Sequence, residues 1–217
     1  MRNKLDRFRE NLARRNVIEP GKPIFEQIRG NWSSFFGNDY PITFELGCGK
    51  GEYTIGLARQ YPHQNFVGVD VKGARIWVGS TQAVEEQLDN AAFLRIRLLD
   101  IDQYVAEQEA AQLWITFPDP RPRDSDAKRR ITGHRFLDLY RKILQPDGWV
   151  HLKTDSDALF GYTQEVLQER SDIRELAKTP DLYASSLYGP DQQIITGYER
   201  KFRQENKKIK YLRFQFG

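Results

Sequence analysis

The sequence holds one cysteine, Cys48, and only three histidines, His63, His134 and His151. A single cysteine cannot form a disulfide within the chain, and it cannot supply a cysteine-based zinc site. The histidines do not follow any metal-ligand spacing. No histidine lies near Cys48 in sequence to activate it as a nucleophile, so we interpret it as a small packing residue. We therefore expect neither a metal site nor cysteine chemistry.

Long apolar runs and a strong charge of one sign are also missing. No stretch is apolar over the length that a transmembrane helix needs, and the charged N-terminus lacks the apolar core of a signal peptide. The expected location is the cytoplasm. The formal net charge is only +3, so a nucleic-acid partner must be argued from local clusters. Whether the chain is a monomer or a homodimer stays open.

Strand-like and helix-like segments alternate from residue 42 onward. Residues 1–22 are basic, and we expect them to form a partly helical arm before a domain over residues 23–217. The strand candidates, which are short apolar or alternating runs, are 42–46, 65–70, 92–99, 113–117, 149–153 and 209–216. The helix candidates are 52–61, 74–88, 133–144 and 156–170, with a turn at 146–148. This alternation predicts an α/β fold with a mainly parallel sheet and helices on both faces.

A glycine cluster follows the first of these strands. Glu45 precedes Gly47, Gly49 and Gly51, which allow tight turns and a close approach of the backbone to a ligand. The dinucleotide fingerprint G-x-G-x-x-G is not met, because Glu52 stands at the third glycine position. A carboxylate here would repel a pyrophosphate, but it attracts the ammonium and sulfonium charges of S-adenosylmethionine.

Further acids stand where the next two strands end. Asp70 ends the second strand and can accept hydrogen bonds from a ribose diol. Asp100, after the third, is a candidate contact for the adenine amino group. Any one of these acids could be a solvated strand-end residue, but the series of acid, glycines and acid argues against that interpretation for the set. The series predicts a class I, Rossmann-like methyltransferase fold with seven strands.

The fourth strand runs into a proline-rich, basic loop, FPDPRPR, followed by Asp124 to Arg130. Prolines stiffen a loop and remove backbone donors. The loop combines the carboxylate of Asp119 with five basic residues, and such residues beside a cleft suit phosphate contacts. These are Arg121, Arg123, Lys128, Arg129 and Arg130. A charge run is usually a solvated loop, but this one adjoins the predicted active site.

Four segments together resemble the bacterial tRNA (guanine-N7)-methyltransferases. They are ELGCGKG (45–51), FPDPRPR (117–123) with the trailing KRR (128–130), KTD (153–155) and TGYE (196–199). The resemblance covers nearly the whole chain, and the last three segments in that order are its specific part. The chain departs from the family where Arg121 and Arg123 replace the usual Trp and Lys.

The resemblance implies methyl transfer from S-adenosylmethionine to N7 of guanine 46 in the tRNA variable loop. It implies that Glu45, Asp70, Asp100 and Asp119 contact the cofactor, together with the glycines of the loop. The guanosine would be held by Arg123, Asp155, Thr196, Gly197, Tyr198 and Glu199. The stretch after Arg123 would touch RNA, with Arg121, Lys128, Arg129 and Arg130 as the candidate contacts.

This chemistry needs no histidine base, because guanine N7 is an in-plane lone pair that carries no proton. Asp119 and Asp155 are the candidate catalytic acids, since a carboxylate can accept hydrogen bonds from the guanine N1–H and amino group and offset the developing positive charge. Basic clusters in the arm and around residues 200–210 favour an RNA-binding face.

Three other interpretations fit less well. An NAD-dependent oxidoreductase is disfavoured by Glu45 and the missing third glycine. A DNA amino-methyltransferase would carry Asp/Asn-Pro-Pro-aromatic, whereas Arg121 follows Asp119-Pro120. A non-catalytic RNA-binding scaffold is disfavoured, because every acid that a methyltransferase needs is present.

Overall fold

A computed structural model describes residues 3–217. Met1 and Arg2, which belong to the predicted arm, lie outside the described residues. One eight-stranded sheet has the order β1-β4-β3-β2-β5-β6-β8-β7. The strands are β1 (Val17–Ile18), β2 (Ile42–Leu46), β3 (Asn65–Val69), β4 (Ala91–Leu94), β5 (Ala110–Thr116), β6 (Leu144–Thr154), β7 (Ile173–Thr179) and β8 (Lys210–Phe216). Every neighbouring pair is parallel except β6·β8 and β7·β8.

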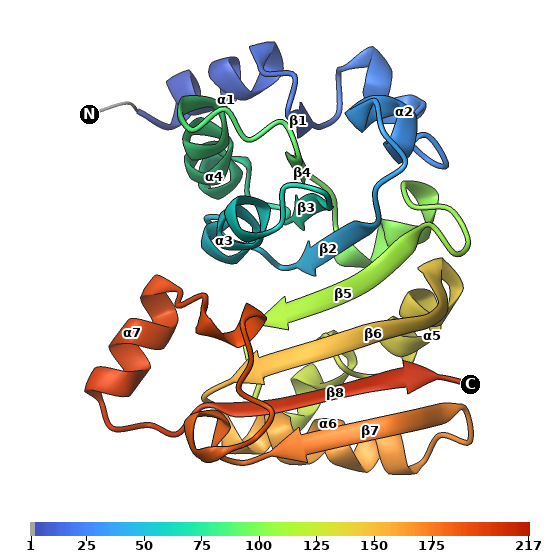
Figure 1. Cartoon of the computed structure of the whole chain (residues 1–217), viewed down its shortest axis with the longest axis vertical. Coiled ribbons are helices and arrows are strands. Elements are labelled where there is room, and N and C mark those ends of the chain that lie inside the picture. The colour runs from blue at the N-terminus through green and yellow to red at the C-terminus, as the bar shows by residue number, and fades with distance from the viewer. Residues whose placement is uncertain (1–2) are drawn as a thin grey trace.

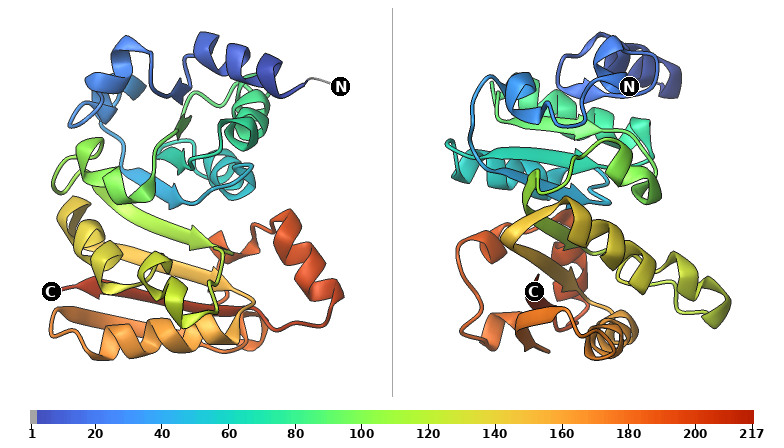
Figure 2. Two further views of the ribbon diagram at one scale, coloured as in Figure 1. Left: turned by 180° about the vertical axis from the view of Figure 1, so that it is seen from behind. Right: turned by 90° about the vertical axis from the view of Figure 1, so that its right-hand side faces the viewer.

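Helices lie on both faces of this sheet (Figures 1 and 2). The α-helices are α1 (Lys4–Ala13), α2 (Trp32–Phe36), α3 (Glu52–Gln60), α4 (Gly73–Glu85), α5 (His134–Ile143), α6 (Asp157–Gln168) and α7 (Gly197–Gln204). Short 3-10 turns are η1 (Pro23–Glu26), η2 (Leu98–Gln103), η3 (Asp124–Arg129), η4 (Leu182–Ala184) and η5 (Asp191–Gln193). The doubly covered sheet predicted from the sequence is thereby confirmed.

Alternation along the strands creates two apolar cores. On β2, Phe44 and Leu46 belong to the core that α5 and α6 cover, through side chains such as Phe136 and Leu159. The other core packs residues of α3 and α4, such as Tyr53 and Ile76, against the opposite face. A strand that is buried on both faces is apolar almost throughout, which explains why the short apolar runs identified the central strands.

The sheet has one strand more than the seven predicted. The additional pairing comes from β1, two residues long, which adds to the edge of β4 through Val17 and Ile18. The helix that precedes β1, α1, packs on α4. Asn11 Nδ2 donates to Gly73 O at 2.9 Å, and the guanidinium of Arg14 lies 5.3 Å from the centre of the Trp77 ring.

The strand expected over 92–99 is shorter in the structure, because β4 ends at Leu94. Its neighbour β3 ends in register at Val69, so no partner remains beyond that point, and the chain turns into η2. The expected turn at 146–148 lies within β6, where residues 145–148 stand between the pairs Ala110↔Leu144 and Gln112↔Trp149. No strand was predicted at β7, whose charged residues Arg174, Glu175 and Lys178 are exposed.

Candidate active site

The segments singled out in the sequence meet at one edge of the sheet. Strands β2, β5 and β6 point toward the same side of the molecule, and α7 lies beyond their carboxyl ends (Figure 1). In open α/β sheets, ligands bind outside the carboxyl ends of the strands. The backbone joins the ends of β5 and β6, since Phe117 N donates to Lys153 O at 2.8 Å.

The glycine loop adopts a conformation that other residues rarely take. Gly47, Gly49 and Gly51 have φ of 80°, 58° and 74°. A Cβ at Gly51 would lie 2.4 Å from Cε1 of Phe93, whereas a Cβ at Gly49 would meet nothing within 4 Å. Gly51 is therefore required for packing within the protein. Gly49 faces open space, which fits a loop that a ligand approaches closely.

Glu45 lies under this loop and is enclosed. Its Oε1 accepts from the Thr116 hydroxyl at 2.6 Å, and its Oε2 accepts from Thr54 N at 2.9 Å and from the Thr54 hydroxyl at 2.5 Å. The residue is 3% exposed. Burial raises the pKa of Glu45 to about 7, with a smaller contribution from the nearby charge of Asp70, against the lowering effect of these hydrogen bonds. Glu45 thus braces α3 and β5 beneath the glycine turn.

Asp70 and Asp100, both predicted cofactor contacts, lie in different settings. Asp70 Oδ2 accepts from Gly49 N at 3.0 Å, and Oδ1 accepts from Lys72 N at 2.8 Å. Asp70, which directly follows β3, therefore holds the glycine loop that follows β2. Asp100 lies in η2 and makes a paired contact with Arg97, at 2.8 and 3.0 Å. The structure joins Asp70 directly to the loop and gives Asp100 a local partner.

The proline loop carries Asp119 at the end of β5. The Asp119 side chain is 63% exposed, and its Oδ2 lies 3.1 Å from Arg121 Nε. Phe117 and Arg121 have φ of 47° and 48°, a left-handed conformation that is uncommon for such residues. Such strained conformations persist only where the surroundings hold them, and they are frequent at functional sites. Arg123 is exposed.

The basic residues after this loop do not all face solvent. Lys128 and Arg129 are exposed, and Arg129 pairs with Asp126 at 3.1 Å. The Arg130 side chain is only 12% exposed, and its guanidinium donates to carbonyl oxygens of the proline loop. The structure therefore separates two neighbouring arginines that the sequence had assigned to the same role.

Asp155 lies one residue beyond β6. Its Oδ2 lies 3.2 Å from Lys207 Nζ, and its side chain is 19% exposed. The following helix α6 is capped by the next residue, since Ser156 Oγ accepts from Leu159 N at 3.2 Å. Asp155 is therefore not the N-cap of α6, and its carboxylate lies at the carboxyl end of β6, beside the candidate site.

The TGYE segment begins α7 and is tied to the rest of the site. Thr196 is the N-cap of α7, through its hydroxyl and Glu199 N at 3.2 Å. Gly197 N donates to the carboxylate of Glu52, the first residue of α3. Glu199 is fully buried and pairs with Lys153, whereas Tyr198 is 56% exposed. Backbone and Tyr198 ring are therefore the parts of this segment that a ligand can reach.

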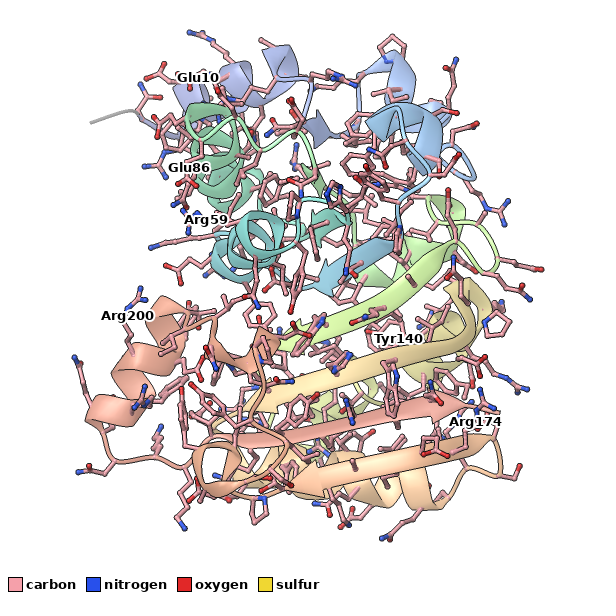
Figure 3. The ribbon with its side chains drawn as sticks, viewed as in Figure 1. Glu10, Arg59, Glu86, Tyr140, Arg174 and Arg200 are labelled. Atoms are coloured by element: carbon pink, nitrogen blue, oxygen red, sulfur yellow. The ribbon has the colours of Figure 1, made fainter. Side chains whose placement is uncertain are left out.

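Two helices that border the site are joined at the surface. Figure 3 shows Arg59 of α3 beside Glu86 at the end of α4, with Nη2 and Oε1 2.5 Å apart. On α7, Arg200 points outward, and its side chain is 60% exposed. These contacts hold the glycine-loop helix in place and leave cationic side chains on the outer side of the site.

Several residues of the site were not found in the sequence analysis. Thr54 and Thr116, the partners of Glu45, are ordinary residues of a helix and a strand, so no local pattern marks them. The lysine of the KTD segment was visible, but nothing in the sequence paired it with Glu199. No group of three or more His, Cys, Asp or Glu among residues 3–217 is arranged to hold a metal. Over the same residues, none of the helices combines the length and apolarity needed to span a bilayer.

Comparison with known proteins places these features in context. A family model described as "Putative methyltransferase" matches residues 39–212. The chain is 42% identical to the tRNA (guanine-N(7)-)-methyltransferase of Cytophaga hutchinsonii, over 99% of this chain and 98% of that protein. It is 45% identical to the protein of the same name from Christiangramia forsetii, with the same coverage.

Solved structures share the fold at much lower identity. The 16S rRNA methyltransferase KamB matches with a TM-score of 0.62 and 13% identity, over 92% of this chain and 95% of that one. A 30S ribosomal A1408 methyltransferase from an uncultured bacterium matches with a TM-score of 0.61 and 14% identity, over 87% and 93%. These matches confirm the Rossmann-like methyltransferase fold.

Proposed function

Because this chain belongs to the family of bacterial tRNA (guanine-N7)-methyltransferases, we propose that it methylates N7 of a guanosine in tRNA with S-adenosylmethionine as donor. We further propose that the target is guanine 46 in the variable loop and that the protein works in the cytoplasm. The main support is that the four family-like segments, far apart in sequence, meet at one sheet edge. Relatives of nearly equal length carry the corresponding name.

The glycine loop and its neighbours fit the cofactor. The open space at Gly49, together with Gly47, allows a ligand to lie against the backbone. Asp70 carries a carboxylate beside that space, at the strand end where a ribose diol is commonly bound. We keep Glu45, Gly51, Asp100 and Asp119 in the proposed cofactor set; Glu45 and Gly51 act by shaping the loop. When bound, S-adenosylmethionine supplies an electrophilic methyl group.

The residues on the guanine side provide position and charge. N7 needs no proton removed, so alignment and electrostatic stabilisation are the tasks left to the protein. We propose that Asp119 and Asp155 accept hydrogen bonds from the guanine N1–H and amino group and stabilise the cationic ring. Arg123, Thr196, Gly197 and Tyr198 would complete the guanosine pocket, and Glu199 would support it from below.

The tRNA backbone needs cations that solvent can reach. Lys128 and Arg129 are exposed beside the proline loop, and Arg121 is partly exposed. Phosphate contacts of this kind position RNA without reading its sequence. Other exposed basic residues extend the cationic surface, whereas Lys210 is buried. They are Lys4 and Arg9 of α1, and Arg200, Lys201, Arg203, Lys207 and Lys208. The base itself must leave its stack, which costs a few kcal/mol by analogy with base flipping.

Nucleoside analysis tests the proposal. The purified protein is incubated with methyl-labelled S-adenosylmethionine and unmodified tRNA, and the digested RNA is separated. Label in 7-methylguanosine is expected, and label in any other nucleoside contradicts the base assignment. A tRNA with adenine in place of guanine 46 should take up no label. Equal labelling of that tRNA would keep N7 methylation but move its position.

A further inference from the structure

Arg130 makes a set of contacts that its neighbour Arg129 does not. Arg130 Nε donates to Arg121 O at 3.0 Å, and Nη2 donates to Pro122 O at 3.3 Å and to Arg123 O at 3.5 Å. The guanidinium carbon lies 4.4 Å from the centre of the Tyr162 ring on α6. The side chain of Arg129, in contrast, is 70% exposed.

The proline loop needs such an outside donor. Pro118, Pro120 and Pro122 alternate through it, so every second residue lacks a backbone N–H donor. Among the N–H groups that remain, that of Arg121 donates to Asp119 Oδ1 at 3.3 Å. Three consecutive carbonyls, from Arg121 to Arg123, point to one side chain. A guanidinium offers five N–H donors in a rigid fork and also stacks on aromatic rings, so arginine alone among the side chains can make all these contacts together.

We propose that Arg130 is a positioning residue that fixes the loop carrying Asp119 to helix α6. This inference rests on the proposed methyl transfer. Arg130 joins two of the segments that hold the proposed catalytic acids, because α6 follows Asp155 directly and carries Tyr162. Arg130 therefore sets the position of Asp119 relative to Asp155 and makes no phosphate contact itself.

The chain after Arg130 is anchored independently, which makes the clamp stiff. Tyr140 Oη donates to Ile131 O at 3.1 Å, and the hydroxyls of Thr132 and Thr163 lie 2.7 Å apart, both buried. A Cβ at Gly133 would lie 2.9 Å from Tyr162 Oη. A larger residue at position 133 would therefore displace the Tyr162 side chain on which Arg130 stacks. Because the backbone on the C-terminal side of Arg130 is fixed in this way, its guanidinium can hold a loop that has few backbone donors of its own.

The neighbouring arginines provide a matched test. Arg130→Lys keeps the positive charge but removes the fork, Arg130→Gln removes the charge, and Arg129→Gln removes the charge of the exposed neighbour. Three quantities are measured on each: the single-turnover methylation rate at saturating tRNA, the salt dependence of tRNA affinity, and hydrogen exchange of the loop amides at residues 119–129. Thermal melting confirms that each variant is folded.

A positioning role predicts a distinct pattern. Arg130→Lys should lower the single-turnover rate by about tenfold or more, since small displacements of aligned groups are costly, and should speed exchange in the loop. Arg130→Gln should leave the log–log salt slope of tRNA binding unchanged. Arg129→Gln should reduce that slope by about 0.7–0.9 without faster exchange in the loop.

The opposite pattern overturns the inference. If Arg130 binds phosphate, Arg130→Lys will methylate at the wild-type rate and Arg130→Gln will flatten the salt slope as Arg129→Gln does. The exchange measurement needs no activity, so it separates this inference from the proposed function. An inactive wild-type protein with faster loop exchange in Arg130→Lys refutes the proposed function and supports the clamp. Wild-type exchange in Arg130→Lys refutes the clamp in every case.

Discussion

Lys153 Nζ lies 2.8 Å from Glu199 Oε2, and neither side chain is exposed to solvent. Lys153 also donates to Gln192 O at 3.0 Å and to Ile194 O at 3.2 Å, and the Tyr183 hydroxyl donates to Glu199 Oε1 at 2.8 Å. Burial lowers the pKa of Lys153, and the carboxylate of Glu199 opposes that effect. The KTD and TGYE segments are thus two halves of one buried network that holds α7 over the sheet.

Removing one partner of this pair should be much worse than removing both. Lys153→Met leaves a buried carboxylate without its counter-charge, and we expect a loss of about 3–5 kcal/mol in the free energy of unfolding. Adding Glu199→Gln removes the unpaired charge and should recover part of that loss. Urea unfolding of both single variants and the double variant measures the coupling. Strictly additive losses would show that the two charges do not stabilise each other.

Glu45 should make stability depend on pH in an unusual direction. Its folded-state pKa of about 7 lies above the ordinary value of 4.5, so the folded state holds the proton more tightly. Its contribution to the free energy of unfolding is full below about pH 4.5 and is lost as the pH rises through about 7, a change of roughly 3 kcal/mol. Glu45→Gln should remove this decline.

The free energies of unfolding of the wild type and of Glu45→Gln at pH 5 and pH 8 measure this pH dependence. Glu107→Gln, a substitution of an exposed glutamate, is the control. The Glu107 variant should follow the wild-type pH profile. A Glu45→Gln profile parallel to wild type would assign the pH dependence to other groups.

The same Glu45→Gln protein should bind S-adenosylhomocysteine more weakly if the carboxylate also acts on the cofactor. Calorimetry measures this affinity directly.

The glycine loop offers a pair of substitutions with different outcomes. Gly49→Ala introduces strain of about 1–2 kcal/mol at φ +58°, and its methyl group enters the space proposed for the cofactor. Gly51→Ala adds a clash with Phe93, which should cost a further 1–3 kcal/mol, roughly. Calorimetry and thermal melting should therefore show weaker S-adenosylhomocysteine binding in a folded Gly49→Ala, and a lower Tm in Gly51→Ala. Undiminished binding by Gly49→Ala would move the cofactor away from Gly49.

Substitutions at Asp155 and Ser156 distinguish a catalytic role from a helix-capping role. Ser156→Ala loses the cap on α6 and should cost about 1 kcal/mol of stability with an unchanged rate. Asp155→Ala should keep S-adenosylmethionine binding and lower single-turnover methyl transfer by at least about tenfold, or about 1.4 kcal/mol, because the carboxylate acts on the guanine as it becomes cationic. Thermal melting and single-turnover rates on the same preparations test both. A wild-type rate in Asp155→Ala would remove it from the proposed catalytic pair.

The sequence by itself determined the fold class and the place of the site. Strands such as 113–117 (LWITF) were predictable because a strand buried on both faces is largely apolar, and Gly47, Gly49 and Gly51 were predictable because few other residues tolerate positive φ. Acids at successive strand ends pointed to one sheet edge, since parallel strands end together. These signals are local, so a single sequence carries them.

Only the tertiary structure decided what each polar side chain contacts. Lys153 and Glu199 lie 46 residues apart, and Glu45 finds Thr116 across 71 residues, so no spacing along the chain reveals either contact. The same holds for the two arginines at 129 and 130. They are adjacent and chemically identical, but the turn after η3 directs one toward solvent and the other onto three carbonyls. Charge is visible in a sequence, whereas the environment that gives a charge its role depends on packing between distant segments.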